Sequence, residues 1–341
     1  MEKLSFKIYI KENKEVNGVF RKLRKLFLLF LTLFLVTSCA NGTKKTDNNE
    51  TETPNKIEKP KEVVEVNSKN ECEQFALLNT SVAGGLFFDK EGNMLVGKPS
   101  SLEKVSVAGE VTTFCDLNEP GKKRNYFFNS PFIWDMKYDK DNNIIAAAQD
   151  RILKIDPEGK VTTLIRENFN GFLGASGLEL DEEGNIYVVS GSKVYKYSKN
   201  LEKTEYLSSD QYKTFFSIAF SPDKKYLYLT DFNTKSLIKY EIKKDGTVGK
   251  HQEIVRDPVK DSGSFGAPLN IIFSDSGNMY VSIDGMSRIL KIDKDENLYL
   301  IKMDKTIRNH VIQFGTKEFG EDYIYITTYS NTVYRMKLDD K

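Results

Sequence analysis

The apolar residues in the C-terminal three quarters of the chain follow a repeated unit of short strands. Each unit has an apolar strand, a turn rich in Asp, Gly and Asn, and a second apolar strand, as in "GLELDEEGNIYVVS". Six such units follow residue 82, and their matching positions lie 40 to 53 residues apart: Phe88, Tyr138, Leu180, Phe220, Phe273 and Phe314. A period of about 40 to 50 residues with several strands per unit is typical of propeller blades.

Further strands complete most of these units, for example "RILKID" at 151–156 and "VTTLI" after it. The sixth unit has only three strands of its own before Lys341, and "EQFALLN" at 73–79 can supply its missing outer strand. Such closure hides strand edges that an open stack of strands would expose. The sequence therefore predicts an all-β fold, a six-bladed β-propeller with four-stranded antiparallel blades, its ring closed by an N-terminal strand in the last blade. A β-sandwich is the alternative architecture.

The beginning of the chain has the pattern of an export signal. A basic "RKLRK" is followed by an apolar run from Leu26 to Val36, too short for a permanent transmembrane helix, and then by "VTSC" ending at Cys39. This ending resembles the bacterial lipobox, in which the cysteine is acylated and becomes the first mature residue. We therefore predict a bacterial lipoprotein, held by Cys39 in the outer membrane or at the cell surface. An ordinary secretory signal is the alternative.

The chain divides into three predicted regions: a signal peptide at 1–38, a lipidated cysteine with a disordered tether at 39–70, and the propeller at 71–341. The tether is assigned because it is dense in Lys, Glu, Asn and Thr and cannot bury enough surface to offset its ordering entropy. Cys72 and Cys115 fall on different predicted blades, so we expect two free thiols, although an exported protein could pair them.

Charge and motif content exclude several function classes. Removing residues 1–38, with eight Lys and Arg and three Asp and Glu, changes the net charge from +1 to −4, which gives no electrostatic basis for nucleic-acid binding. The sequence has only two histidines, too few for a His-cluster metal site. It contains no HExxH or CxxC motif, no GxxxxGK[ST] phosphate-binding loop and no GxSxG nucleophile turn. We expect a monomer whose partners are the membrane and an unidentified small molecule, glycan or protein.

Two segments carry a family resemblance. "SIAFSPDKKYLYLTD" (217–231) and "VIQFGTKEFGEDYIYITT" (311–328) resemble blade segments of the senescence-marker-protein/gluconolactonase family, and the likeness extends over about residues 73–340. Strictosidine-synthase-like and NHL-type propellers share much of the pattern. The resemblance implies a six-bladed propeller with a divalent cation, usually calcium, at the channel mouth. It also implies that a lactone or phosphoester could be hydrolysed there.

The family's metal ligands can be placed on this sequence through the repeat. The family Glu falls on Gly84, and two Asn positions fall on Ser176 and Phe216, so Asp231 is the one carboxylate that remains at a family ligand position. Calcium needs several oxygen ligands, so Asp231 is a weak candidate for a Ca²⁺ ligand. The alternative is a turn residue that caps backbone N–H groups, a role that Asn would fill nearly as well. A one-residue shift of the alignment would bring other oxygen donors to the mouth: Asp135, Asn270, Asp284 and Asn309.

The remaining residues at the predicted mouth form a different kind of surface. Aromatic walls with a few polar groups suit an organic ligand, and the candidate ligand mouth comprises Trp134, Ser176, Phe216, Asp231, Asp284, His310 and Tyr329. Packing between blades is the alternative role for its aromatic residues. These residues are consistent with two alternative functions. The first, which we favour, is a binding propeller on a lipoprotein. The second is a divalent-metal-dependent lactonase in which Asp231 is a ligand or base.

Overall fold

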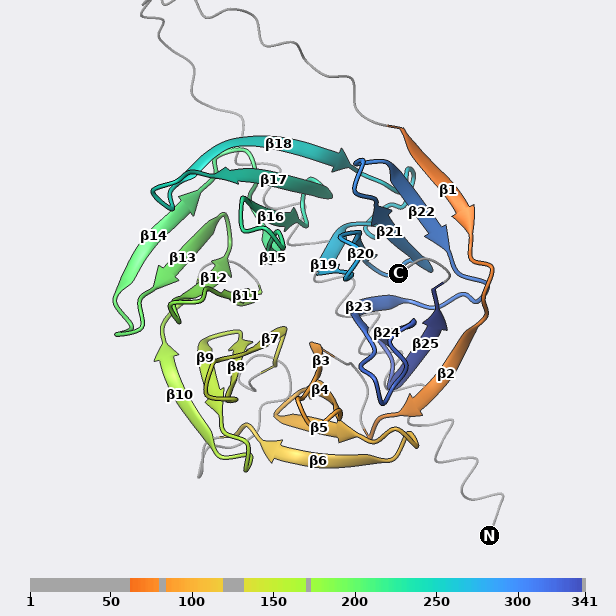
Figure 1. Cartoon of the computed structure of the whole chain (residues 1–341), viewed down its shortest axis with the longest axis horizontal. Helices are drawn as coiled ribbons and strands as arrows, with labels where there is room; N and C mark the ends of the chain where they lie inside the picture. Colours follow the sequence, from red (N-terminus) through yellow and green to blue (C-terminus); the bar gives the residue numbers. More distant parts are fainter. Residues whose placement is uncertain (1–61, 80–83, 119–131, 170–172, 339–341) are drawn as a thin grey trace, which may run out of the picture. The chain divides into compact units, whose positions relative to one another are not determined.

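The computed structural model describes residues 62–79, 84–118, 132–169 and 173–338, and these belong to one compact unit, Lys59–Lys341. Six sheets, each with four antiparallel strands at its centre, stand in a ring around a central axis (Figure 1). The prediction of a six-bladed β-propeller is confirmed. Within the described ranges there is no helix long and apolar enough to cross a membrane. The predicted signal peptide and Cys39 lie outside the described residues.

The first three blades are each built from four consecutive strands, numbered from the channel outward. Blade 1 consists of β3 (Leu86–Phe88), β4 (Met94–Lys98), β5 (Ser101–Val105) and β6 (Val111–Asp116). Blade 2 consists of β7 (Asp135–Tyr138), β8 (Ile144–Ala148), β9 (Arg151–Ile155) and β10 (Val161–Arg166). Blade 3 consists of β11 (Ala175–Leu180), β12 (Ile186–Ser190), β13 (Lys193–Tyr197) and β14 (Lys203–Ser208).

The next two blades follow the same order. Blade 4 consists of β15 (Phe215–Phe220), β16 (Tyr226–Asp231), β17 (Ser236–Ile242) and β18 (Val248–Arg256). Blade 5 contains β19 (Pro268–Phe273), β20 (Met279–Ile283), β21 (Arg288–Ile292) and β22 (Leu298–Lys302).

Blade 6 closes the ring with strands from both ends of the unit. Its inner strands are β23 (Asn309–Phe314), β24 (Tyr323–Thr328) and β25 (Thr332–Lys337), and its outer strand is β2 (Cys72–Leu77), which pairs antiparallel with β25. The predicted closure by the N-terminal segment is therefore confirmed. Cys72 in blade 6 and Cys115 in blade 1 are buried free thiols, as expected from their different blades.

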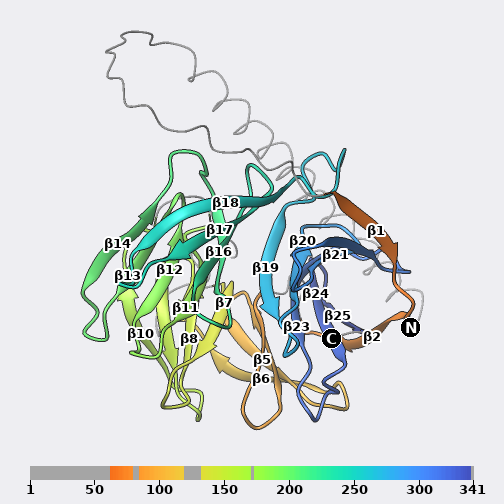
Figure 2. The same cartoon turned by 45° about the horizontal axis from the view of Figure 1, so that its top comes forward.

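One strand lies where the sequence predicted a disordered tether. β1 (Val63–Asn67) pairs in parallel with β22 and gives blade 5 a fifth strand, which runs along the outside of the ring (Figure 2). Val63 packs against the core between blades 4 and 5, and Glu65 forms an ion pair with Arg288 at 2.7 Å. The prediction of disorder to residue 70 is wrong for this segment. The tether is polar on average, but this short segment is rich in β-branched residues that favour a strand and bury apolar surface.

The hairpin turns explain why the repeat is rich in Asp, Gly and Asn. In blade 1 the Asp89 carboxylate accepts hydrogen bonds from the backbone and side-chain amides of Asn93, and Gly92 has φ +80°, which favours glycine. Asp139 and Asn143 repeat the arrangement in blade 2.

Six apolar clusters hold the ring together, one between each pair of neighbouring blades. Hydroxyl groups on second strands add hydrogen bonds to the inner strand of the next blade. Thr230 donates to the Leu269 carbonyl at 2.9 Å, and Ser282 donates to the His310 carbonyl at 2.8 Å. These bonds fix the heads of the inner strands and so the positions of the residues at the mouth.

Candidate ligand-binding mouth

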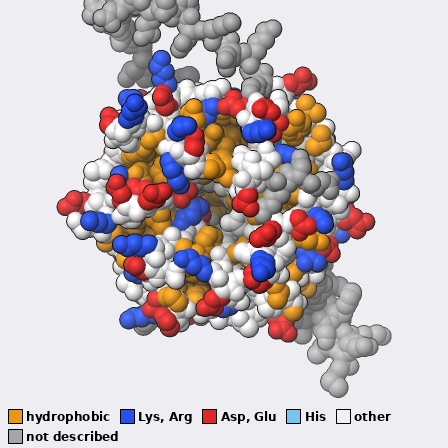
Figure 3. Space-filling model, in the orientation of Figure 1, with side chains coloured by type: hydrophobic (Ala, Val, Ile, Leu, Met, Phe, Trp, Pro, Cys, Tyr) orange, Lys and Arg blue, Asp and Glu red, His pale blue; other side chains and the backbone are white. Residues whose placement is uncertain are grey.

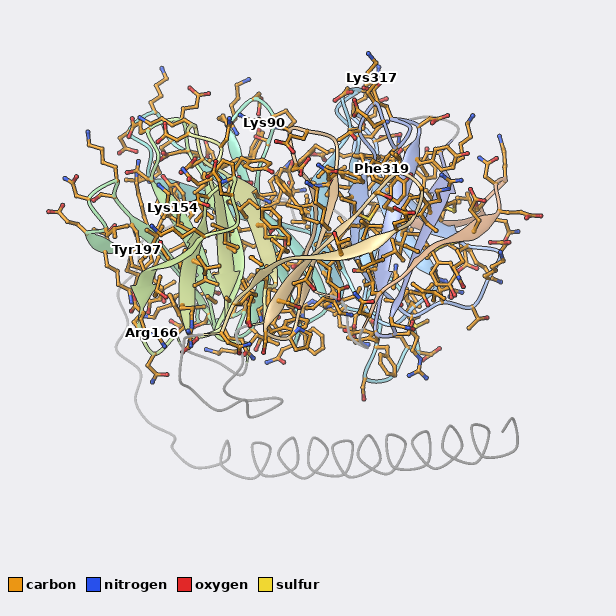
Figure 4. The ribbon with its side chains drawn as sticks, turned by 90° about the horizontal axis from the view of Figure 1, so that it is seen from below. Lys90, Lys154, Arg166, Tyr197, Lys317 and Phe319 are labelled. Carbon is orange, nitrogen blue, oxygen red and sulfur yellow. The ribbon has the colours of Figure 1, made fainter. Side chains whose placement is uncertain are left out.

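The predicted mouth lies on the face where the outer strand of one blade leads to the inner strand of the next. Figure 4 labels Arg166, at the end of such an outer strand, on one side of the ring, and the hairpin-turn residues Lys90 and Lys317 on the other. The inner strands therefore begin on the Arg166 side, where Trp134, Phe216 and His310 stand at or next to the strand starts.

Aromatic rings from three blades meet at this mouth. The Trp134 ring lies 5.8 Å from both the Phe216 ring and the His310 ring, edge to face, and Phe216 and His310 lie 6.2 Å apart. Tyr329 adds a fourth ring, 4.8 Å from His310. Phe216 and His310 are buried, whereas Trp134 is partly exposed and Tyr329 is 37% exposed. The four residues form an aromatic floor with two solvent-facing members, and we call them the aromatic cluster.

The aromatic cluster contains a polar group with no partner. The indole Nε1 of Trp134 is shielded from solvent and has no hydrogen-bond partner among the residues that the structure describes. A buried donor without an acceptor costs about 1–3 kcal/mol, so such groups are rare in folded proteins.

A buried acid supports the rim of the cluster. The Tyr329 hydroxyl donates a hydrogen bond to Asp284, which is 3% exposed. Burial raises the pKa of Asp284 to about 6, although the Tyr329 hydrogen bond and the Lys235 charge act in the opposite direction. Burial and the neighbouring Asp284 charge raise the pKa of Tyr329 well above its usual value, so Tyr329 stays protonated and holds its ring in place.

Asp231 is fully buried and its carboxylate is engaged by backbone and hydroxyl groups. Oδ2 accepts a hydrogen bond from the Thr214 amide at 2.7 Å, and Oδ1 accepts two bonds at 2.8 Å from the amide and hydroxyl of Thr234. These contacts are those of a capping residue that joins the segment before β15 to the turn after β16.

The positions expected to hold a calcium ion do not fit one. Gly84 occupies the place of the family Glu, and a Cβ there would lie 2.2 Å from the Ile133 carbonyl oxygen, so no side chain fits without a backbone shift. Lys98 ends the second strand of blade 1, is fully buried, and has its pKa lowered to about 8 by burial. Among the described residues no group of three or more His, Cys, Asp or Glu side chains is placed to hold a metal ion.

The other predicted oxygen donors serve the framework. Ser176 donates to the Phe215 carbonyl at 3.3 Å. Asp135 accepts from the Leu178 amide at 3.0 Å, and Asn270 exchanges two hydrogen bonds with the Ile312 backbone. Asn309 donates to the Arg288 carbonyl, and its buried Oδ1 accepts no hydrogen bond from any residue in the described ranges. These residues connect neighbouring strands rather than converge on a common point.

The opposite end of the channel is polar. Figure 3 shows that face, hollowed at its centre and ringed by mixed basic and acidic side chains. Inside the channel, Lys137 lies 3.4 Å from Asp135. Burial alone would lower the pKa of Lys137, but the charges of Asp135 and Glu179 leave it raised. Burial raises the pKa of Glu179, an effect that the Lys137 charge partly opposes.

Two rim residues were missed by the sequence reasoning. Phe265 and Arg308 lie in loops outside the repeated strands, and the Arg308 guanidinium stands 5.5 Å from the Phe265 ring centre. The repeat predicts the positions of strands and hairpin turns only, so it does not predict that residues in these loops lie at the mouth.

The fold and mouth define a six-bladed propeller with an aromatic channel entrance. The sequence matches the family model described as SMP-30/Gluconolactonase/LRE-like region over residues 58–330, so the chain belongs to that family. No curated protein matches the sequence.

Solved structures share the fold at low sequence identity. A Xanthomonas campestris gluconolactonase is 14% identical with a TM-score of 0.61, covering 79% of this chain and 89% of its own. An Agrobacterium tumefaciens calcium-binding regucalcin is 13% identical with a TM-score of 0.60 and coverages of 80% and 95%. An auxiliary nutrient binding protein from Bacteroides ovatus is 10% identical with a TM-score of 0.62 and coverages of 78% and 76%.

Proposed function

We propose that this protein is a membrane-anchored extracytoplasmic lipoprotein whose propeller mouth binds an organic ligand without a catalytic metal. The observation that carries the proposal is the aromatic cluster, in which rings from three blades converge around the unpartnered Nε1 of Trp134. Rigid aromatic side chains supply contact area at a low entropy cost, and a free donor can orient a polar group of the ligand.

The residues at the family's metal positions favour binding over metal-dependent hydrolysis. A lactonase needs a cation to polarise the substrate carbonyl, and that cation needs several oxygen ligands. Here Gly84 leaves no room for a ligand side chain and the oxygens of Asp231 already accept three hydrogen bonds. Family membership keeps lactone hydrolysis as the alternative, and calcium-dependent stabilisation of the purified protein distinguishes the two.

The anchor in this proposal is an acylated Cys39. Twenty-four positions separate Cys39 from Val63, the start of β1. At full extension this segment spans at most about 80 Å, so the propeller would remain close to the membrane. Placement in the outer membrane or at the cell surface, and a monomeric state, belong to the same proposal.

Ligand binding at the mouth is tested by thermal-shift measurements with a panel of organic acids, sugars and short peptides. We expect at least one compound to raise the melting temperature of the wild type and to lose this effect in Tyr329→Ala. Tyr299→Ala is the matched control, because Tyr299 lies on β22, the fourth strand of blade 5 counted from the channel. Equal effects of a compound on all three proteins would place its binding elsewhere and overturn the proposal.

A further inference from the structure

The rim of the mouth between blades 5 and 6 carries an exposed aromatic residue that is held in a fixed position. Phe265 is 40% exposed, and its ring rests on Gly285, where a Cβ would lie 2.4 Å from the ring. The Ser262 hydroxyl donates to the Phe265 carbonyl at 2.6 Å, and Lys235 donates to Ser262 at 2.8 Å. An exposed ring with its backbone already ordered loses little entropy on binding a partner.

Arg308 stands beside this ring and differs from the other arginines in the described ranges. Each of the other five lies within 3.2 Å of a carboxylate oxygen: Arg151, Arg166, Arg256, Arg288 and Arg335. Arg308 is exposed and, among the described residues, no carboxylate pairs with it; its guanidinium lies over the Phe265 ring. A guanidinium stacked on an aromatic ring keeps its N–H groups free for a planar anion.

The arginine is continuous with the aromatic cluster. The Tyr329 amide donates to the Arg308 carbonyl at 3.3 Å, and the Gly285 amide donates to the neighbouring Asn309 carbonyl at 3.2 Å. Tyr329 then packs on His310 at the centre of the mouth. Asp284 is buried and bonded to Tyr329, and Asp257 pairs with Lys235 at 3.2 Å. The positive charge of Arg308 therefore stands at one end of an apolar surface.

We propose that Arg308 binds the carboxylate of a small organic acid whose apolar body covers Tyr329 and the exposed edge of Trp134. This inference rests on the proposed function of the mouth and specifies its ligand class. A carboxylate matches the guanidinium fork with two parallel hydrogen bonds, and the aromatic rings supply the contact area for the rest of the molecule.

The test uses two probes of nearly equal shape, 3-phenylpropionate and 3-phenylpropionamide, in which a neutral amide replaces the charged carboxylate. Trp134 is the only tryptophan of the chain, so its fluorescence reports binding at the mouth. We expect the wild type to bind the acid about tenfold more tightly than the amide, a difference that salt reduces. Arg308→Gln should bind both probes equally, and Arg308→Lys should retain part of the preference. Arg166→Ala, on an outer strand of blade 2, is the matched control and should behave as the wild type.

The outcomes separate this inference from the proposed function. Equal binding of acid and amide by the wild type would leave the mouth as a binding site but overturn the carboxylate assignment. A preference for the acid that persists in Arg308→Gln would also overturn it. If neither probe binds, the carboxylate assignment fails, while binding at the mouth is decided by the thermal-shift panel with Tyr329→Ala.

Discussion

Replacing Asp231 by asparagine tests whether this carboxylate is a capping group or a metal ligand. The three donors around it are the Thr214 amide, the Thr234 amide and the Thr234 hydroxyl. An asparagine oxygen can accept the two bonds from Thr234, but its NH₂ group would then face the Thr214 amide, another donor. The sequence-based expectation of a nearly neutral substitution is therefore revised.

The expected cost follows from one buried N–H group left without an acceptor. That loss destabilises a protein by about 1–3 kcal/mol. For a propeller of this size, with an unfolding entropy of about 2 cal/mol/K per residue, each kcal/mol lowers the melting temperature by about 2 °C. We thus expect Asp231→Asn to melt about 2–5 °C below the wild type. Calcium should change the melting temperature of neither protein.

Asp223→Asn is the matched control, because Asp223 also accepts hydrogen bonds in blade 4 but lies in an exposed hairpin turn. Its substitution should lower the melting temperature by less than about 1 °C. Scanning calorimetry of the wild type, Asp231→Asn and Asp223→Asn, each with and without calcium, measures these melting temperatures. The reasoning is refuted if calcium stabilises the wild type alone and Asp231→Asn melts like the wild type in the absence of calcium.

Three further predictions concern other parts of the chain. Deleting residues 40–61 should leave stability unchanged. Extending the deletion to residue 69 removes β1, exposes the edge of β22 and should promote aggregation. Equal melting temperatures and solubilities of the two deletion variants would contradict this role of β1. Asp284 has a raised pKa in the folded protein, so native Asp284 binds more protons than the unfolded chain, and stability should fall by up to about 3 kcal/mol as pH rises from about 4 to about 6. Asp284→Asn should flatten this part of the pH profile, and an unchanged slope in melts across that range would disprove the assignment. Fatty-acid labelling should require Cys39 and disappear in Cys39→Ala, and labelling that persists in the variant would exclude acylation there.

The fold was predictable from sequence because each blade repeats the same pattern of strand and turn residues. Alternating apolar residues mark the strands, and Asp, Gly and Asn mark the hairpin turns at regular intervals. The closing strand β2 was predictable because the last unit lacked an outer strand. β1 was not, because its five residues sit in a polar stretch and their partner is more than 200 residues away.

The mouth was only partly predictable. The repeat places Trp134, Phe216 and His310 at or beside the inner-strand heads, and their rings do meet. The role of Asp231 depends on Thr214 and Thr234, which lie in segments that the repeat does not specify. Phe265 and Arg308 come together through loop conformations, and no periodic pattern encodes those contacts.

The central claim, an organic-ligand site in place of a metal site, is tested most directly through the indole N–H of Trp134. Within the described part of the chain this group has no hydrogen-bond partner. The chain has a single tryptophan, so one NMR resonance of ¹⁵N-labelled protein reports on it. Titration with 3-phenylpropionate should shift this resonance in the wild type, and titration with calcium chloride should not. A resonance that moves with stoichiometric calcium and stays fixed with the organic acid would contradict the account.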